Sequence, residues 1–139
     1  MTMPSEDGDR AEIAALVSTF FAAFTAGPGL AERMDGLRSL FVPGAVIVKT
    51  CGELTVYGVD EFIAPRLALL TGGSLNDFSE WETEGHSEVW GDIAQHWCSY
   101  AKKGLQDGVP FTGSGMKTLQ FVRTSDGWRI ASAAWDDAR

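Results

Sequence analysis

Several residue types are scarce in this chain, and each scarcity excludes a class of protein. Lysine and arginine total 11 residues against 19 aspartates and glutamates, which gives a formal net charge of −8 at pH 7. An acidic chain repels phosphate groups, so we expect neither nucleic acid nor an anionic membrane surface as a partner. No apolar run approaches the roughly 18 residues that a membrane-spanning helix needs, so we expect no membrane protein.

Cysteine and histidine are also rare, with two residues of each type. Cys51 and Cys98 lie far apart in the sequence and belong to no spaced metal-binding motif. We therefore expect two reduced thiols rather than a disulfide or a metal pair. The acidic N-terminal residues lack the basic start and apolar stretch of a secretory signal, which predicts a cytoplasmic protein.

The residues that are abundant indicate one globular unit. Hydrophobic residues make up 45% and charged residues 22% of the 139 residues. These proportions are typical of folded domains, and the length suffices for one domain with a substantial core. We expect a flexible tail over residues 1–8 and a single domain over residues 9–139.

Helix and strand patterns follow one another along the chain in a definite order. Apolar side chains recur at helical spacing over residues 9–26, with Asp9 as the N-cap, and again over residues 30–41 and 60–70. Strands are expected over residues 45–49, 54–57, 81–90, 93–102, 116–124 and 128–135, with a long loop before the fifth of them. Helices followed by long antiparallel strands predict an α+β fold.

Three short segments carry a resemblance to a known family. They are the segment GDIAQHWCSY at residues 91–100, the segment from Gly115 through residues 119–123, and the segment DGWRI at residues 126–130 that leads to Trp135. Together they resemble the nuclear transport factor 2-like superfamily, close to its SnoaL-like and ketosteroid-isomerase-like members. The resemblance implies a cystatin-like cone, in which a curved antiparallel sheet wraps a long N-terminal helix. It also implies a pocket at the wide end and a homodimer formed through the outer face of the sheet.

Strand alternation predicts which side chains line this cone. If Gly91-Asp92 is a two-residue turn, eight side chains share the inner face of the sheet: Thr83, Gly85, Ser87, Val89, Ala94, His96, Cys98 and Tyr100. Trp90 and Trp97 then lie on the outer face, where we expect the subunit contact. A turn at Asp126-Gly127 places on the inner face Thr118, Gln120, Ala131, Ala133 and Trp135. A bulge or a one-residue register shift would invert these assignments.

His96 is the candidate catalytic residue, because a histidine among small side chains can accept or donate a proton near neutral pH. The other interpretation is a core histidine that is hydrogen-bonded to a backbone or hydroxyl group. Asp77, Glu80 and Asp136 are alternative bases near the mouth of the cone. The expected ligand-binding residues are Phe20, Phe24, Tyr100, Gln120 and Trp135. We expect no metal and no cofactor.

The sequence departs from the isomerase members at the position of their acidic base. Residues 45–49 carry no carboxylate, and residues 20, 21 and 24 are phenylalanines where a tyrosine could complete an oxyanion site. Steroid-isomerase chemistry is therefore not expected. Two hypotheses remain: a protein that binds a small hydrophobic molecule in an apolar pocket without proven catalysis, or a cofactor-independent isomerase, cyclase or dehydratase with His96 as acid or base.

Overall fold

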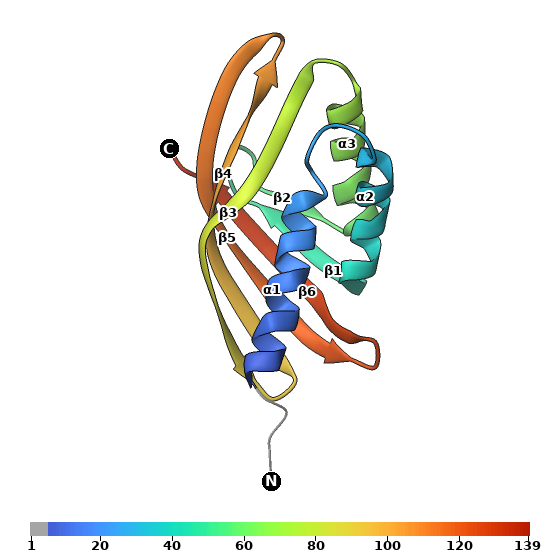
Figure 1. The fold of residues 1–139 in the computed structure, drawn as a ribbon, viewed down its shortest axis with the longest axis vertical. Coiled ribbons are helices and arrows are strands. Elements are labelled where there is room, and N and C mark those ends of the chain that lie inside the picture. Colours follow the sequence, from blue (N-terminus) through green and yellow to red (C-terminus); the bar gives the residue numbers. More distant parts are fainter. Residues whose placement is uncertain (1–5) are drawn as a thin grey trace.

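The computed structural model describes residues 6–139, which form three α-helices, one short 3-10 helix and six strands (Figure 1). The helical segments are α1 (Glu6–Ala22), α2 (Leu30–Gly36), the 3-10 helix η1 (Leu37–Leu40) and α3 (Val59–Thr71). The strands are β1 (Phe41–Lys49), β2 (Thr55–Tyr57), β3 (Leu75–Trp90), β4 (Ile93–Gln106), β5 (Val109–Thr124) and β6 (Gly127–Asp137). The predicted α+β class is confirmed. No helix among the described residues is long and apolar enough to cross a membrane.

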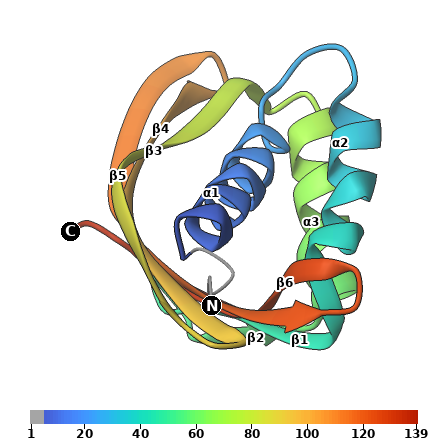
Figure 2. The ribbon, with the colours of Figure 1, turned by 60° about the horizontal axis from the view of Figure 1, so that its bottom comes forward.

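The sheet curves around α1, and α2 and α3 close the side that the sheet leaves open (Figure 2). The strand order is β2-β1-β6-β5-β4-β3. All neighbouring strands are antiparallel except β1 and β6, which are parallel. The expectation of a wholly antiparallel sheet is therefore corrected at this pair. β1 and β6 lie far apart in the sequence, so no hairpin forces them to run in opposite directions.

The long helix α1 buries one side against the concave face of the sheet. Ile13, Val17, Phe20 and Phe21 are buried at helical spacing, as the apolar pattern predicts. Asp9 is not the N-cap, because the helix already includes Glu6, Asp7 and Gly8. Of the predicted tail over residues 1–8, residues 1–5 lie outside the described part of the chain.

Asp9 instead connects α1 to the last hairpin. Its carboxylate accepts hydrogen bonds from both terminal nitrogens of Arg123, at 2.9 and 3.0 Å, and from the indole nitrogen of Trp128 at 3.1 Å. These bonds from Arg123 and Trp128 hold the pKa of Asp9 below its usual value. This charged contact, together with apolar packing, therefore fixes the N-terminal part of α1 to the hairpin of β5 and β6.

Two hairpin turns differ from the sequence-based expectation. The long loop expected after residue 102 is absent, because β4 and β5 continue to a two-residue turn at Asp107-Gly108. Both turn residues have positive φ angles, of 51° and 81°, which aspartate tolerates and glycine favours. The turn between β5 and β6 is Ser125-Asp126, one residue earlier than expected, because Thr124 pairs with Gly127.

The inner and outer faces that were predicted for β5 are reversed, because the pairing with β6 shifts between Gln120 and Phe121 and leaves Ala131 as an extra residue on β6. Leu119 and Phe121 are buried, whereas Gln120 is exposed on the outer face. The expectation that Gln120 points inward is wrong, because a one-residue shift moves every side chain to the opposite face. Beyond this bulge, Ala133 pairs with Leu119 and Trp135 pairs with Lys117, so Trp135 points inward as predicted.

Candidate functional site

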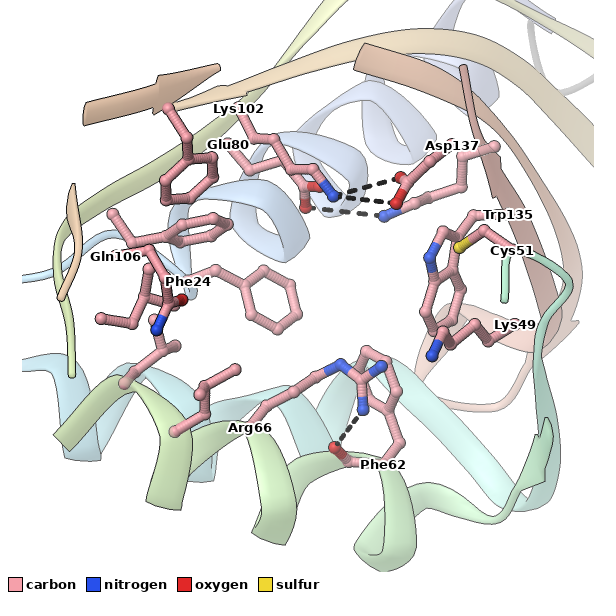
Figure 3. Close-up of a pocket in the computed structure, with 16 residues that line it drawn as sticks. Phe24, Lys49, Cys51, Phe62, Arg66, Glu80, Lys102, Gln106, Trp135 and Asp137 are labelled. Carbon is pink, nitrogen blue, oxygen red and sulfur yellow. Dashed lines mark hydrogen bonds and ion pairs between the residues drawn. The ribbon is translucent and has the colours of Figure 1, made fainter. Parts of the chain in front are cut away.

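A cavity of about 270 Å³ lies at the wide end of the cone, between α3 and the concave face of the sheet. Figure 3 shows its labelled side chains arranged around an open centre. The lining residues are Phe24, Lys49, Cys51, Phe62, Arg66, Leu69, Leu70, Leu75, Phe78, Glu80, Lys102, Gln106, Phe111, Lys117, Trp135 and Asp137. They come from α3, from five of the strands or their ends, and from the segment that follows α1.

Aromatic rings form much of the cavity wall. The ring of Phe62 on α3 meets Trp135 on β6 edge to face at 5.8 Å, and it meets Phe24 at 6.0 Å in the same manner. Tyr57 stacks parallel to Trp135 at 6.5 Å and supports it from the side. Rings in contact hold one another in place, so these walls present flat apolar surfaces with little freedom to collapse inward.

The charged groups of the cavity are mostly positive. Its four cationic side chains outnumber its two carboxylates; the cations are Lys49, Arg66, Lys102 and Lys117, and the carboxylates are Glu80 and Asp137. The cavity thus has a formal charge of +2 inside a chain whose net charge is −8. A local excess of cations in an acidic protein attracts anions to this one region.

Arg66 on α3 lies among the aromatic rings without a carboxylate partner in residues 6–139. Its guanidinium carbon is 4.1 Å from the centroid of Phe62, 5.0 Å from that of Tyr57 and 5.1 Å from that of Trp135. One terminal nitrogen donates a hydrogen bond to the carbonyl of Phe62 at 3.1 Å. Burial lowers the pKa of Arg66, but an arginine remains charged in proteins. A positive charge with free donors therefore faces the cavity.

Lys117 on β5 reaches the cavity from the opposite wall. Its Nζ is 3.7 Å from a carboxylate oxygen of Glu80, and the two side chains are only 5% and 13% exposed. Aromatic rings surround the ammonium group, with centroids at 4.7 to 5.6 Å, and belong to Phe20, Phe21, Tyr100 and Trp135. Burial lowers the pKa of Lys117, while the charge of Glu80 acts in the opposite direction.

Asp137 closes the cavity at the end of β6 (Figure 3). Its carboxylate accepts a hydrogen bond from the hydroxyl of Tyr100 at 2.5 Å and bonds from Lys102 at 3.1 Å to both oxygens. Burial raises the pKa of this carboxyl, but the bonds from Tyr100 and Lys102 outweigh it, so the pKa lies below its usual value. Burial and Asp137 together raise the pKa of Tyr100. The phenol therefore stays protonated and holds Asp137 in place.

Comparison with solved structures identifies the fold of this chain. No protein-family model matches the chain, and no curated protein sequence matches it. Solved structures do. A nuclear transport factor 2-like superfamily protein from Salmonella enterica serovar Typhimurium is 12% identical, with a TM-score of 0.80 over 97% of this chain and 94% of that one. The chain has the nuclear transport factor 2-like fold.

Two further structures support this assignment. A proposed dehydratase of the nuclear transport factor 2-like family from Streptomyces avermitilis is 20% identical, with a TM-score of 0.75 over 97% of this chain and 99% of that one. A protein with a cystatin-like fold from Novosphingobium aromaticivorans is 21% identical, with a TM-score of 0.69 over 94% and 82%. The nuclear transport factor 2-like fold hosts different activities, so the site itself must indicate the function.

Within this fold, the sequence-predicted site residues lie in three different places. Phe24 and Trp135 line the cavity. Phe20 and Tyr100 are buried behind it and contact Lys117, so they support the wall rather than form it. Gln120 lies on the opposite side of the sheet, where its side-chain oxygen accepts a hydrogen bond from Ser132 at 3.1 Å.

His96 is buried on the inner face but does not line the cavity. Its Nδ1 is 2.7 Å from the hydroxyl of Ser87, and its Nε2 is hydrogen-bonded to the carboxylate of Glu82. Both ring nitrogens are therefore occupied, and the hydroxyl partner is the one that the core-histidine interpretation expects. A Cβ atom on Gly85 would lie 2.8 Å from His96 Nε2, so the pair depends on the glycine.

Glu82 is the carboxylate that sequence reasoning missed. Unbroken alternation from the Gly91-Asp92 turn places it on the outer face, but the pairing between β3 and β4 shifts between Glu82 and Glu84. Thr83 is the extra residue, and its hydroxyl lies 2.7 Å from that of Ser99 instead of facing inward as expected. The bulge turns Glu82 toward His96 and Cys98, whose ligand atoms all lie within 4.8 Å of one another and could hold a metal ion.

Arg66 and Lys117 were also missed, for different reasons. Arg66 follows Phe62 by one helical turn, so the apolar pattern of α3 contained a signal for its direction. No sequence pattern indicated that Lys117 points inward. The predicted register placed Thr118 and Gln120 on the inner face, and it therefore placed Lys117 on the outer face. The cationic character of the cavity is therefore a finding of the structure.

Proposed function

We propose that this protein binds a small organic anion with a flat apolar body in the cavity between α3 and the sheet. The observation that carries the proposal is Arg66, a partly buried cation that faces the cavity and forms no salt bridge with a carboxylate among residues 6–139. Buried charges are normally paired, because an isolated charge loses its hydration without compensation. A ligand carboxylate would supply the missing partner.

The shape of the cavity favours an aromatic ligand. The rings of Phe24, Phe62 and Trp135 offer faces and edges on which a flat ring can pack. The volume of about 270 Å³ lies just below the range of about 300–1,000 Å³ that is usual for drug-sized ligands, which indicates a monocyclic molecule. An aromatic acid with one ring has a flat apolar body of this size, and its carboxylate is the negatively charged partner that Arg66 lacks.

A calorimetric titration tests this proposal with benzoate and with benzamide, which has nearly the same shape but no charge. We expect benzoate to bind the more tightly. Arg66→Gln should weaken benzoate binding about tenfold to a hundredfold, as expected from loss of a charge-assisted hydrogen bond of about 1.5–3 kcal/mol. Arg10→Gln, at an exposed arginine on the far part of α1, is the matched control and should leave binding unchanged. Equal affinities for acid and amide would refute the proposal.

A structural role for His96 is part of the same proposal. The acid–base role in an isomerase, cyclase or dehydratase requires a ring nitrogen within reach of the substrate. Ser87 and Glu82 occupy both nitrogens, and the ring lies outside the cavity lining. We therefore assign to His96 the task of holding β3 against β4 at the bulge.

We also propose that the outer face of the sheet binds a second copy of this chain. Large apolar side chains are exposed there on neighbouring strands; they are Trp90, Ile93, Trp97 and Met116. Trp90 is 83% exposed, which is rare for tryptophan on a surface without a partner. Sedimentation should give a dimer that Trp97→Lys converts to a monomer, and a monomeric parent protein would contradict the proposal.

A further inference from the structure

Lys117 is a buried amine that makes no hydrogen bond with any group of residues 6–139. Its nearest carboxylate oxygen, on Glu80, is 3.7 Å away, which is an ion-pair distance but too long for a hydrogen bond. An ammonium group has three donors, and burying them without acceptors is costly. The ion pair with Glu80 and the surrounding aromatic rings stabilise the charge, but they leave the three donors without a hydrogen-bond acceptor, and the side chain ends at the cavity.

The surroundings of Lys117 favour the uncharged amine more than those of an ordinary lysine. Burial acts most strongly, and the positive charges of Arg66 and Lys102 in the same cavity act in the same direction. Glu80 and the thiol of Cys98 act in the opposite direction. An apolar pocket with neighbouring cations is the setting in which a lysine becomes a nucleophile near neutral pH.

We infer that Lys117 is a nucleophile that forms an imine with the carbonyl carbon of an aldehyde or ketone bound in the cavity. The inference rests on the proposed function, because the ligand's anionic group would be held at Arg66 while its carbonyl meets Nζ. The substrate class is a small aromatic or flat apolar molecule that carries both a carboxylate and a carbonyl group. The two cations come from opposite walls, α3 and β5, which suits a ligand with two functional ends.

Glu80 supplies the proton transfers that this step needs. The ammonium of Lys117 gives one proton to the Glu80 carboxylate, and the free electron pair of Nζ then attacks the carbonyl carbon. A second proton moves from nitrogen to the carbonyl oxygen and gives a carbinolamine. Glu80 returns its proton to the hydroxyl group, the carbon–oxygen bond breaks, and water leaves. The products are a protonated imine and one water molecule, so the net charge is unchanged and Glu80 pairs with the iminium as it paired with the ammonium.

Reductive trapping of the intact protein tests the inference. The probe is 4-formylbenzoate with sodium cyanoborohydride, which reduces an imine to a stable secondary amine that mass spectrometry detects and peptide mapping locates. We expect one adduct per chain at Lys117, formed about tenfold faster than any adduct at Lys49 or Lys102, which line the same cavity. Lys117→Arg should abolish this adduct, whereas the matched control Lys103→Arg, at an exposed lysine of β4 outside the cavity lining, should keep it.

Several outcomes would overturn the inference. They are the absence of an adduct, labelling spread over lysines according to their exposure, and an unchanged labelling rate in Lys117→Arg. Where Lys117→Arg fails to fold, as judged by circular dichroism, peptide mapping of the parent protein decides on its own.

A parallel titration with 4-(hydroxymethyl)benzoate, which has no carbonyl group, tests the proposed function separately. Binding of this alcohol without trapping of the aldehyde would refute the nucleophile and leave the anion site standing. Selective trapping at Lys117 without binding of the alcohol would support the nucleophile and count against the anion site.

Discussion

Replacement of Lys117 by methionine is expected to destabilise the fold strongly, because it removes the charge that faces Glu80. The two charged groups are 3.7 Å apart and almost fully buried. At an effective dielectric constant of about 20, two unit charges at that distance attract by about 4.5 kcal/mol. Breaking one side of a buried pair typically costs about 3–5 kcal/mol, because the remaining charge stays buried without compensation. We expect a loss in that range at pH 7.

The double variant Lys117→Met with Glu80→Leu separates charge from shape. Replacing both members of a buried pair by apolar side chains of similar size is often neutral, so this variant should lie within about 1 kcal/mol of the parent protein. Urea unfolding followed by tryptophan fluorescence measures the free energy of unfolding of the parent protein, the single variant and the double variant. The reasoning is refuted if the single variant is as stable as the parent, or if the double variant is less stable than the single one.

Three further predictions concern other parts of the fold. Gly85→Ala should lower the free energy of unfolding by about 1–3 kcal/mol, because the added Cβ would overlap the side chains packed above it. At Gly36 an added Cβ meets open space, so Gly36→Ala should be neutral in urea unfolding, and equal effects of the two variants would contradict this packing. Because the pKa of Asp9 is lowered, its stabilisation is complete above the usual carboxyl pKa and is lost as pH falls through the lowered value. Asp9→Asn should therefore lower the melting temperature at pH 7 but not in strong acid, and a pH-independent difference would argue against the charged contact. Burial raises the pKa of Cys98 to about 12, so a thiol reagent should modify Cys51 long before Cys98, and equal rates would show that the core is open.

The sequence predicts the architecture well because its signals are local and repeated. The apolar spacing of α1 and the Gly91-Asp92 turn each indicate one element, and the structure contains both. The inner direction of His96 and Tyr100 follows from that turn, since no bulge lies between it and either residue on β4. Local signals of this kind do not depend on how distant strands pair.

The site could be predicted only where the register was right. The bulge at Ala131 placed Gln120 on the outer face and brought Lys117 to the cavity. The bulge at Thr83 turned Glu82 inward by the same geometry. Bulges arise from the curvature of the whole sheet, and a single strand's residues do not specify them. The Asp107-Gly108 dipeptide, by contrast, is a strong sequence signal for a hairpin turn, and the prediction of a long loop did not take it into account.

A crystal structure of the protein with benzoate is the most direct test of the anion-binding cavity. The account predicts the aromatic ring packed against the wall that Phe24, Phe62 and Trp135 form, with its carboxylate within hydrogen-bond distance of Arg66. A cavity that holds only water at saturating benzoate, or a ligand whose carboxylate points away from Arg66 into solvent, would contradict it.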